Sequence, residues 1–191
     1  MEKLYINAQQ LLEDSFTLAM QVFQSSYQPD YIVGVWRGGA PVGIAVQELL
    51  EYLGVKSDHI AIRTSSYTGI GQRSRTVKVH GLSYITDRVV PGESILLVDD
   101  VYDTGLSLAQ VVSDIERACS AHRPEIRIAT PWYKPSNNLT DRIPDYYVHE
   151  SNQWLVFPHE LNGLTLDEIR RHKPELSKFI LALELSRKST D

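Results

Sequence analysis

The residues best suited to chemistry lie between positions 95 and 108, where an apolar run ends in two carboxylates, Asp99 and Asp100. A third acid, Asp103, follows, and then come Thr104 and Gly105. Carboxylates can accept hydrogen bonds from hydroxyls or hold a metal ion, and the start of a helix presents free backbone N–H groups to an anion. Together these groups predict a site for a phosphorylated sugar. The alternative is that Asp103 or Thr104 only caps the helix that follows.

The elements around these residues can be read from hydrophobic periodicity. The unbroken apolar run before Asp99 predicts a strand buried on both faces, over residues 94–99, and a helix should follow over 106–119. Earlier segments predict a helix at 8–24, a strand at 31–36, a helix at 40–53 and a strand at 59–64. A further strand is expected at 126–130, closed by Pro131. This alternation predicts a doubly wound, largely parallel α/β sheet, which binds ligands beyond the carboxyl ends of its strands.

The remaining segments are less regular. Residues 65–80 are polar and glycine-containing, which indicates a mobile loop. Short aromatic pieces at 146–148 and 154–157 indicate a small subdomain rather than more of the sheet, and residues 165–187 predict one or two helices interrupted at Pro174.

Composition narrows the class of protein. The 191 residues have 42% hydrophobic and 23% charged side chains, which is ordinary for one globular domain with modest additions. The net charge of −5 argues against a nucleic-acid surface. The sequence has neither a signal pattern nor an apolar run of the ~18 residues that could span a bilayer, so no membrane association and a cytoplasmic location are expected. The single cysteine, Cys119, excludes an internal disulfide and fits a reducing compartment.

The run Ile95–Leu108 closely resembles the phosphoribosyl-pyrophosphate (PRPP) signature of the type I phosphoribosyltransferases: an apolar strand, two acids, two variable residues, then Asp-Thr-Gly, any residue, and Ser or Thr. The resemblance implies that Asp99 and Asp100 bind the ribose hydroxyls, directly or through Mg²⁺. It also implies that the 5′-phosphate binds the turn formed by Asp103, Thr104, Gly105, Leu106 and Ser107. Asp103 would in addition be catalytic, near N7 of the base.

Two further segments extend the resemblance. Arg37, Gly38 and Gly39 match the pyrophosphate-binding turn of purine phosphoribosyltransferases, in which the peptide bond before the basic residue is often cis, and Arg37 would be catalytic as well as PRPP-binding. Ser66 and Tyr67 resemble the dipeptide that opens the closing loop of the hypoxanthine-guanine enzymes, and Arg73 and Arg75 of that loop are possible pyrophosphate contacts. A solvated arginine and an ordinary connecting loop are the alternatives.

The base would be selected by a hood over about residues 132–160. The resemblance implies that Lys134 donates to O6 of a 6-oxopurine, that Trp154 stacks on the base, and that the backbone around Leu155 binds its edge. Glu160 would lie near a second Mg²⁺, which completes a metal set of Asp99, Asp100 and Glu160. For each residue alone, a solvated lysine or a core tryptophan is the ordinary interpretation.

The resemblance implies a magnesium-dependent purine phosphoribosyltransferase, with PRPP and a hypoxanthine, guanine or xanthine base as substrates and a homodimer or homotetramer as the assembly. Its catalytic domain would span residues 1–160, and residues 161–191 would form a helical extension. The alternatives are a non-catalytic PRPP or nucleotide sensor of the same fold, an enzyme for uracil, orotate or adenine, and a phosphatase with Asp99 as nucleophile.

Overall fold

A computed structural model of the chain describes residues 2–68, 75–176 and 179–180. These residues form two compact units, one within 9–152 and a smaller one that combines the described parts of 1–8 and 153–191. These limits differ from the expected division near residue 160. In the part of the chain that is described, no helix is long and apolar enough to cross a membrane.

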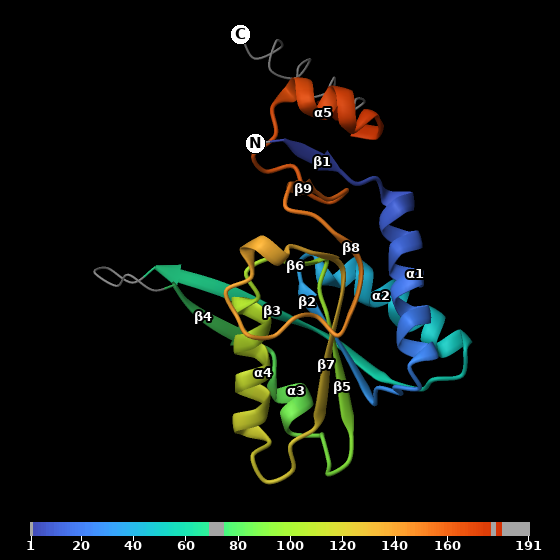
Figure 1. The fold of residues 1–191 in the computed structure, drawn as a ribbon, viewed down its shortest axis with the longest axis vertical. Helices are drawn as coiled ribbons and strands as arrows, with labels where there is room; N and C mark the ends of the chain where they lie inside the picture. Colours follow the sequence, from blue (N-terminus) through green and yellow to red (C-terminus); the bar gives the residue numbers. More distant parts are fainter. Residues whose placement is uncertain (1, 69–74, 177–178, 181–191) are drawn as a thin grey trace. The chain divides into compact units, whose positions relative to one another are not determined.

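The larger unit is an α/β sheet with helices on both sides (Figure 1). Its elements in chain order are α1 (Ala8–Gln24), β2 (Tyr31–Trp36), α2 (Gly39–Tyr52), β3 (Asp58–Thr68), β4 (Arg75–His80), α3 (Ser83–Thr86), β5 (Ser94–Val98), β6 (Val101–Tyr102), α4 (Leu106–Ala118), β7 (Glu125–Tyr133), a 3₁₀ turn (Pro135–Asn137) and β8 (Tyr146–Glu150). The strand order is β4-β3-β2-β5-β7-β6, with β8 also paired to β7. All pairs are parallel except β3 with β4. The predicted fold class is therefore confirmed.

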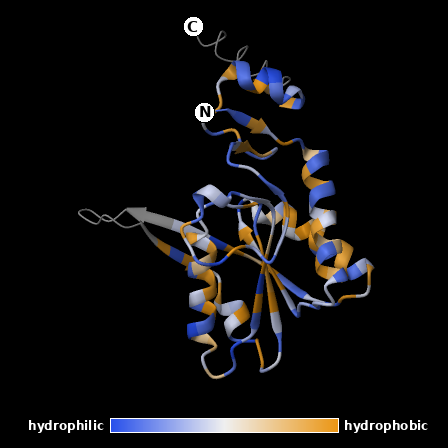
Figure 2. Cartoon of the chain, in the orientation of Figure 1, coloured by the Kyte–Doolittle hydropathy of each residue, from blue (hydrophilic) through white to orange (hydrophobic). Residues whose placement is uncertain are grey.

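The core lies where the central strands meet α4. Val33 of β2 and Leu97 of β5 are fully buried there against Val111 and Ile115 of α4. Figure 2 shows the matching apolar colour along the middle of the sheet. Each such side chain contributes roughly 1.5–3 kcal/mol when it is fully buried. The continuous apolar run before Asp99 therefore fixes β5 as a central strand, with its carboxyl end beside that of β2.

Two expectations about the sheet were wrong. Residues 65–80 are not a loop along their whole length, because β3 continues to Thr68 and pairs antiparallel with β4. This ladder stands at the edge of the sheet, where alternating polar side chains are tolerated and the hydrophobic signal is weak. Residues 146–148 are part of the main sheet rather than of a subdomain, since Tyr146 and Tyr147 pair with Ala129 and Thr130.

Pro131 does not close β7, which continues to Tyr133. The β5 pairing ends at Ala129 and the β6 pairing begins at Trp132, so the proline falls between the two ladders. A residue without a backbone N–H is tolerated at such a gap.

The smaller unit contains a two-stranded parallel sheet of β1 (Lys3–Tyr5) and β9 (Trp154–Val156), followed by α5 (Leu166–His172) and a 3₁₀ turn (Pro174–Leu176). The expected helical break at Pro174 is present, and most of the predicted helical segment beyond Leu176 lies outside the described residues. Thr165 and Glu168 form a capping box at the start of α5. Lys3 Nζ lies 2.7 Å from Glu168 Oε1, and this ion pair links β1 to α5.

Candidate active site

Helix α4 begins in a left-handed turn beside the acidic end of β5. Gly105, immediately before the helix, has φ +75°, and a Cβ there would lie 2.6 Å from the Tyr102 ring. Glycine is the residue that this backbone and this contact both permit. An open hollow of about 310 Å³ at the turn is lined by Asp99, Asp103, Thr104 and Ser107 among others. The free N–H groups of the first turn of α4, together with the hydroxyls of Thr104 and Ser107, form a site suited to a phosphate.

The Tyr102 side chain packs against the turn before α4 and supports it. Its buried hydroxyl contacts Thr140 Oγ1 at 2.9 Å and donates to the carbonyl of Arg142 at 3.0 Å. The backbone N–H of Leu139 donates to the carbonyl of Thr104 at 3.0 Å. The segment after the 3₁₀ turn therefore fixes the shape of the turn before α4.

Asp99 and Asp100 lie side by side after β5, with Asp100 buried and Asp99 partly buried. Burial raises the pKa of the Asp99 carboxyl well above its usual range, and the neighbouring Asp100 carboxylate raises it further. The backbone N–H groups of Asp100 and Gly39 act against this shift by donating to Asp99. A bound cation or ligand hydroxyls would stabilise the ionised pair.

The Gly38–Gly39 turn after β2 packs directly on this acidic end. A Cβ on Gly38 would lie 2.0 Å from Asp100 Oδ2, and a Cβ on Gly39 would lie 2.2 Å from the Val98 carbonyl oxygen. Both glycines are therefore required for close contact with the β5 end. The Trp36–Arg37 peptide bond is cis, as the resemblance implied.

Asp103 is contacted at both carboxylate oxygens from the chain that follows β7. Lys134 Nζ donates to Asp103 Oδ2 at 3.3 Å, and Asn137 Nδ2 donates to Oδ1 at 2.7 Å. The Lys134 side chain is only 12% exposed, so its charge lies against Asp103 rather than in solvent. Lys134 is thus not the solvated lysine of the ordinary interpretation. Asn137 was missed by the sequence analysis, and its only signal was its place three residues after Lys134.

Arg37 is exposed beside a second arginine that the sequence analysis also missed. Arg63 pairs with Trp36 in the β2–β3 register, and Trp36, Arg37, Arg63 and Thr64 line an open hollow of about 610 Å³. The carboxyl ends of parallel strands lie along one edge of a sheet. Arg63 comes near the end of the predicted strand at 59–64, so the sequence did contain a signal that Arg63 would lie near Arg37. Two guanidinium groups at this hollow suit an anionic ligand.

The other predicted base and metal residues belong to the smaller unit. Trp154 is half exposed in β9, and Leu155 is buried and pairs with Leu4. The Glu160 carboxylate accepts a hydrogen bond from the Phe157 N–H at 3.3 Å. Lys173 is buried and donates to the carbonyls of Phe157 and Pro158 at 2.7 and 3.0 Å, which fixes the chain between β9 and Glu160. Burial lowers the pKa of Lys173.

Some predicted contacts fall outside what the structure describes. Ser66 and Tyr67 lie on β3, opposite Val77 and Thr76 of β4, but their side chains are not among the described ones. Arg73 lies outside the described residues, and Arg75 begins β4 with its side chain likewise outside them. Across the described ranges, no group of three or more His, Cys, Asp or Glu side chains is placed to hold a metal ion.

The polar residues of the run Ile95–Leu108 thus lie together at one end of the sheet, with Gly38, Gly39 and Lys134 packed against them. The family described as the phosphoribosyl transferase domain matches residues 5–168. The chain therefore belongs to the phosphoribosyl transferase family, and its function is that of a phosphoribosyltransferase enzyme.

Individual relatives are consistent with this assignment. The chain is 28% identical to a hypoxanthine-guanine phosphoribosyltransferase of Lactococcus lactis over 91% of this chain and 88% of that protein. It is 30% identical to a purine phosphoribosyltransferase from Pyrococcus horikoshii, whose crystal structure matches with a TM-score of 0.66 over 86% of this chain and 98% of that one. A xanthine-guanine-hypoxanthine phosphoribosyltransferase of Helicobacter pylori shares the fold at 22% identity and a TM-score of 0.66, over 90% of this chain and 100% of that one.

Proposed function

We propose that the enzyme transfers the 5-phosphoribosyl group of PRPP to a 6-oxopurine base, in purine salvage, and releases pyrophosphate and the nucleoside 5′-monophosphate. One observation carries the proposal: the Asp103 carboxylate lies at the phosphate-binding turn and is contacted by the nearly buried Lys134 ammonium. An acid and a lysine donor at the start of α4 suit a base attached at C1 of a phosphorylated ribose. The relatives named for purine and hypoxanthine-guanine transfer support the same substrate class.

PRPP would bind across the ends of β2 and β5. The backbone of Thr104, Gly105, Leu106 and Ser107 would bind the 5′-phosphate, with the two side-chain hydroxyls as further donors. Asp99 and Asp100 would accept hydrogen bonds from the ribose hydroxyls. The pyrophosphate group would lie on Gly38 and Gly39 and be neutralised by Arg37, with Ser66 and Tyr67 closing over it to exclude water from the cationic transition state.

Lys134 would select the base through the oxygen at position 6. A lysine can only donate, so hypoxanthine, guanine and xanthine satisfy it, whereas adenine presents a donor there. Asp103 would accept the proton that the purine loses as the glycosidic bond forms. Trp154 would stack on the base and the Leu155 backbone would bind its edge.

Mg²⁺ fits the residues present, since it is usually held by one or two carboxylates together with waters and substrate phosphates rather than by a full protein cage. Asp99 and Asp100 would hold it near the ribose, and Glu160 would hold a second ion near pyrophosphate. Bound there, Mg²⁺ would neutralise charge on the leaving pyrophosphate.

We also propose a homo-oligomer, a dimer or tetramer, located in the cytoplasm. The side chain of Ile44 is 65% exposed on α2, next to a largely apolar groove lined by Ala40, Gly43 and Ala61. An exposed apolar groove of this kind suits a second copy of the chain. Light scattering coupled to size exclusion should give a multiple of 21.7 kDa, and Ile44→Glu should reduce it.

A turnover assay with PRPP, Mg²⁺ and a panel of bases tests the proposal. Nucleoside monophosphate should form with at least one of hypoxanthine, guanine and xanthine, and not with adenine, uracil or orotate. Product from one of the latter bases would refute the purine assignment. PRPP binding without product from any base would indicate a sensor, and phosphate-ester hydrolysis without PRPP would indicate a phosphatase.

A further inference from the structure

A hydrogen bond between two side chains links helix α1 to β8 and plays no part in the proposed reaction. Asp14 lies on the buried face of α1, and its Oδ1 is 2.7 Å from His149 Nε2 in β8. The Asp14 side chain is 10% exposed and that of His149 is 36% exposed. A buried carboxylate is costly without a partner, and an apolar residue would pack on this helix face at lower cost. Such a pair is therefore weak support for stability alone.

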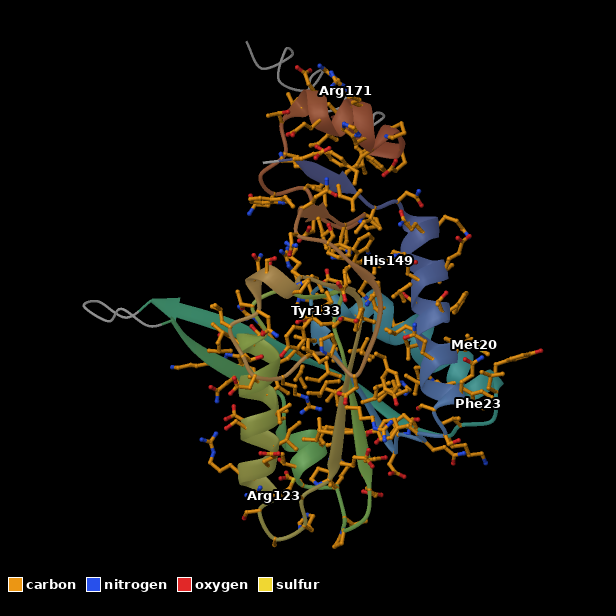
Figure 3. The ribbon with its side chains drawn as sticks, viewed as in Figure 1. Met20, Phe23, Arg123, Tyr133, His149 and Arg171 are labelled. Carbon is orange, nitrogen blue, oxygen red and sulfur yellow. The ribbon has the colours of Figure 1, made fainter. Side chains whose placement is uncertain are left out.

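His149 connects the pair to β7. Its ring lies 4.4 Å from the Trp132 ring, centroid to centroid, at an interplanar angle of 32°. Trp132 and His149 are also register partners in the β7–β8 ladder. The buried indole thus rests on an imidazole whose position Asp14 fixes. Figure 3 labels His149, which lies on β8 beside α1.

Trp132 in turn fixes the chain that carries Lys134. On its other side it pairs with Val101 of β6, and the Lys134 backbone N–H donates to the Tyr102 carbonyl at 2.9 Å. Lys134 is two residues beyond Trp132, and its ammonium contacts Asp103. A rotation or shift of the Trp132 backbone would therefore move the Lys134 ammonium relative to Asp103.

We propose that Asp14 and His149 are positioning residues for base binding: the pair holds Trp132 and through it the donor that recognises the purine. This inference rests on the proposed role of Lys134. The residues proposed to bind the phosphate and the ribose hydroxyls follow β5 or lie at the start of α4, and none lies on β7. Loss of the pair should thus affect the base more than PRPP.

The test compares variants of the full-length enzyme by steady-state kinetics in both substrates. Asp14→Leu should raise KM for the purine about ten-fold, the effect of losing one hydrogen bond to a charged group, while KM for PRPP stays unchanged. Asp14→Asn keeps an acceptor for His149 and should restore most of the affinity. His149→Phe keeps a ring against Trp132 but cannot form a hydrogen bond with Asp14, so it should raise the purine KM as Asp14→Leu does. It replaces Asp14→Leu in the test if that variant does not fold.

Gln21→Leu is the matched control, because Gln21 Nε2 also joins α1 to β8, through the Tyr147 carbonyl at 3.1 Å. It should leave both KM values at the wild-type level. An equal rise in KM for purine and PRPP, or the same rise in Gln21→Leu, would overturn the inference in favour of general packing. Lys134→Ala is assayed in parallel: if it leaves purine KM unchanged, the proposed base contact is wrong, and if it alone raises purine KM, only the positioning inference is wrong.

Discussion

At the scale of single residues, Asp103 connects the turn before α4 to the segment after β7. Its two carboxylate oxygens are contacted by different donors, Lys134 and Asn137, so the acid is oriented rather than only neutralised. A proton acceptor needs this fixed geometry toward the base. The two donors should therefore have separable effects.

Replacement of Lys134 by Ala should raise KM for the purine by about ten- to hundred-fold, because a buried charged donor is lost at O6. KM for PRPP should change little. Steady-state kinetics with each substrate varied checks this, with Lys56→Ala, an exposed lysine in the α2–β3 turn, as the matched control. Equal purine affinity in both variants would contradict the role of Lys134.

Replacement of Asn137 by Ala should lower kcat with a smaller effect on purine KM, because Asp103 loses the donor that orients it but keeps Lys134. A reduction of about ten-fold is expected from one lost hydrogen bond to a carboxylate. Ser136→Ala is the neighbouring control, since Ser136 is exposed and its backbone N–H, which donates to Asn152 Oδ1, is kept. If the two variants lose kcat equally, the effect belongs to the loop and not to Asp103.

At the scale of elements, the β2–α2 turn packs closely on the end of β5, where we propose that PRPP binds. Gly38 has helical backbone angles, φ −64° and ψ −37°, so alanine is acceptable to the backbone there, and the nearest atoms to an added Cβ belong to the Asp100 carboxylate. Asp100 must then rotate away from its proposed place beside the ribose. The contact can therefore be tested without disturbing the helix.

Gly38→Ala should raise KM for PRPP and leave the thermal midpoint of unfolding close to wild type. Gly43→Ala on α2 is the control, because a Cβ there meets only ordinary contacts, the nearest at 3.5 Å. That control should keep PRPP affinity. Isothermal titration with PRPP and Mg²⁺ measures the PRPP affinity of both variants. Unchanged affinity in Gly38→Ala would show that Asp100 does not contact the ribose.

At the scale of the whole molecule, the smaller unit has its own electrostatic link, the Lys3–Glu168 pair. The hydrogen bonds from Lys3 and from the Thr165 backbone lower the pKa of Glu168 to about 2 from its usual 4.5. A lowered pKa stabilises the fold above pH 4.5, and this contribution is lost as the pH falls from 4.5 toward 2. The two side chains are partly exposed to solvent, at 23% and 28%, so salt should weaken their interaction.

Hydrogen exchange at α5 should therefore speed up between pH 4.5 and 2 relative to the intrinsic rate. Glu168→Gln should remove that acid dependence and show faster relative exchange already at neutral pH. Asp167→Asn is the control, because Asp167 is 85% exposed and lies 3.6 Å from Arg170. Wild-type acid behaviour in Glu168→Gln would contradict the role of the ion pair.

The fold was predictable from the sequence where a continuous apolar run marked a buried strand. The apolar runs before Trp36 and before Asp99 predicted β2 and β5 because a strand buried on both faces leaves a continuous hydrophobic segment. The β3–β4 ladder and β8 were missed because edge strands carry mixed polar residues, and β1 was missed because its partner β9 is about 150 residues away. The run Ile95–Leu108 predicted a buried strand, a turn and a helix, and phosphate binding at that turn stays a prediction. Arg63, Asn137 and the Asp14–His149 pair depend on contacts that only the folded chain brings together.

A crystal structure with PRPP and Mg²⁺ tests the central claim most directly. The 5′-phosphate should accept hydrogen bonds from the backbone of residues 104–107, the ribose hydroxyls should lie against Asp99 and Asp100, and the pyrophosphate should lie on Gly38 and Gly39. Ligand density at another place on the molecule, or backbone N–H groups of 104–107 that point away from the phosphate, would contradict the account.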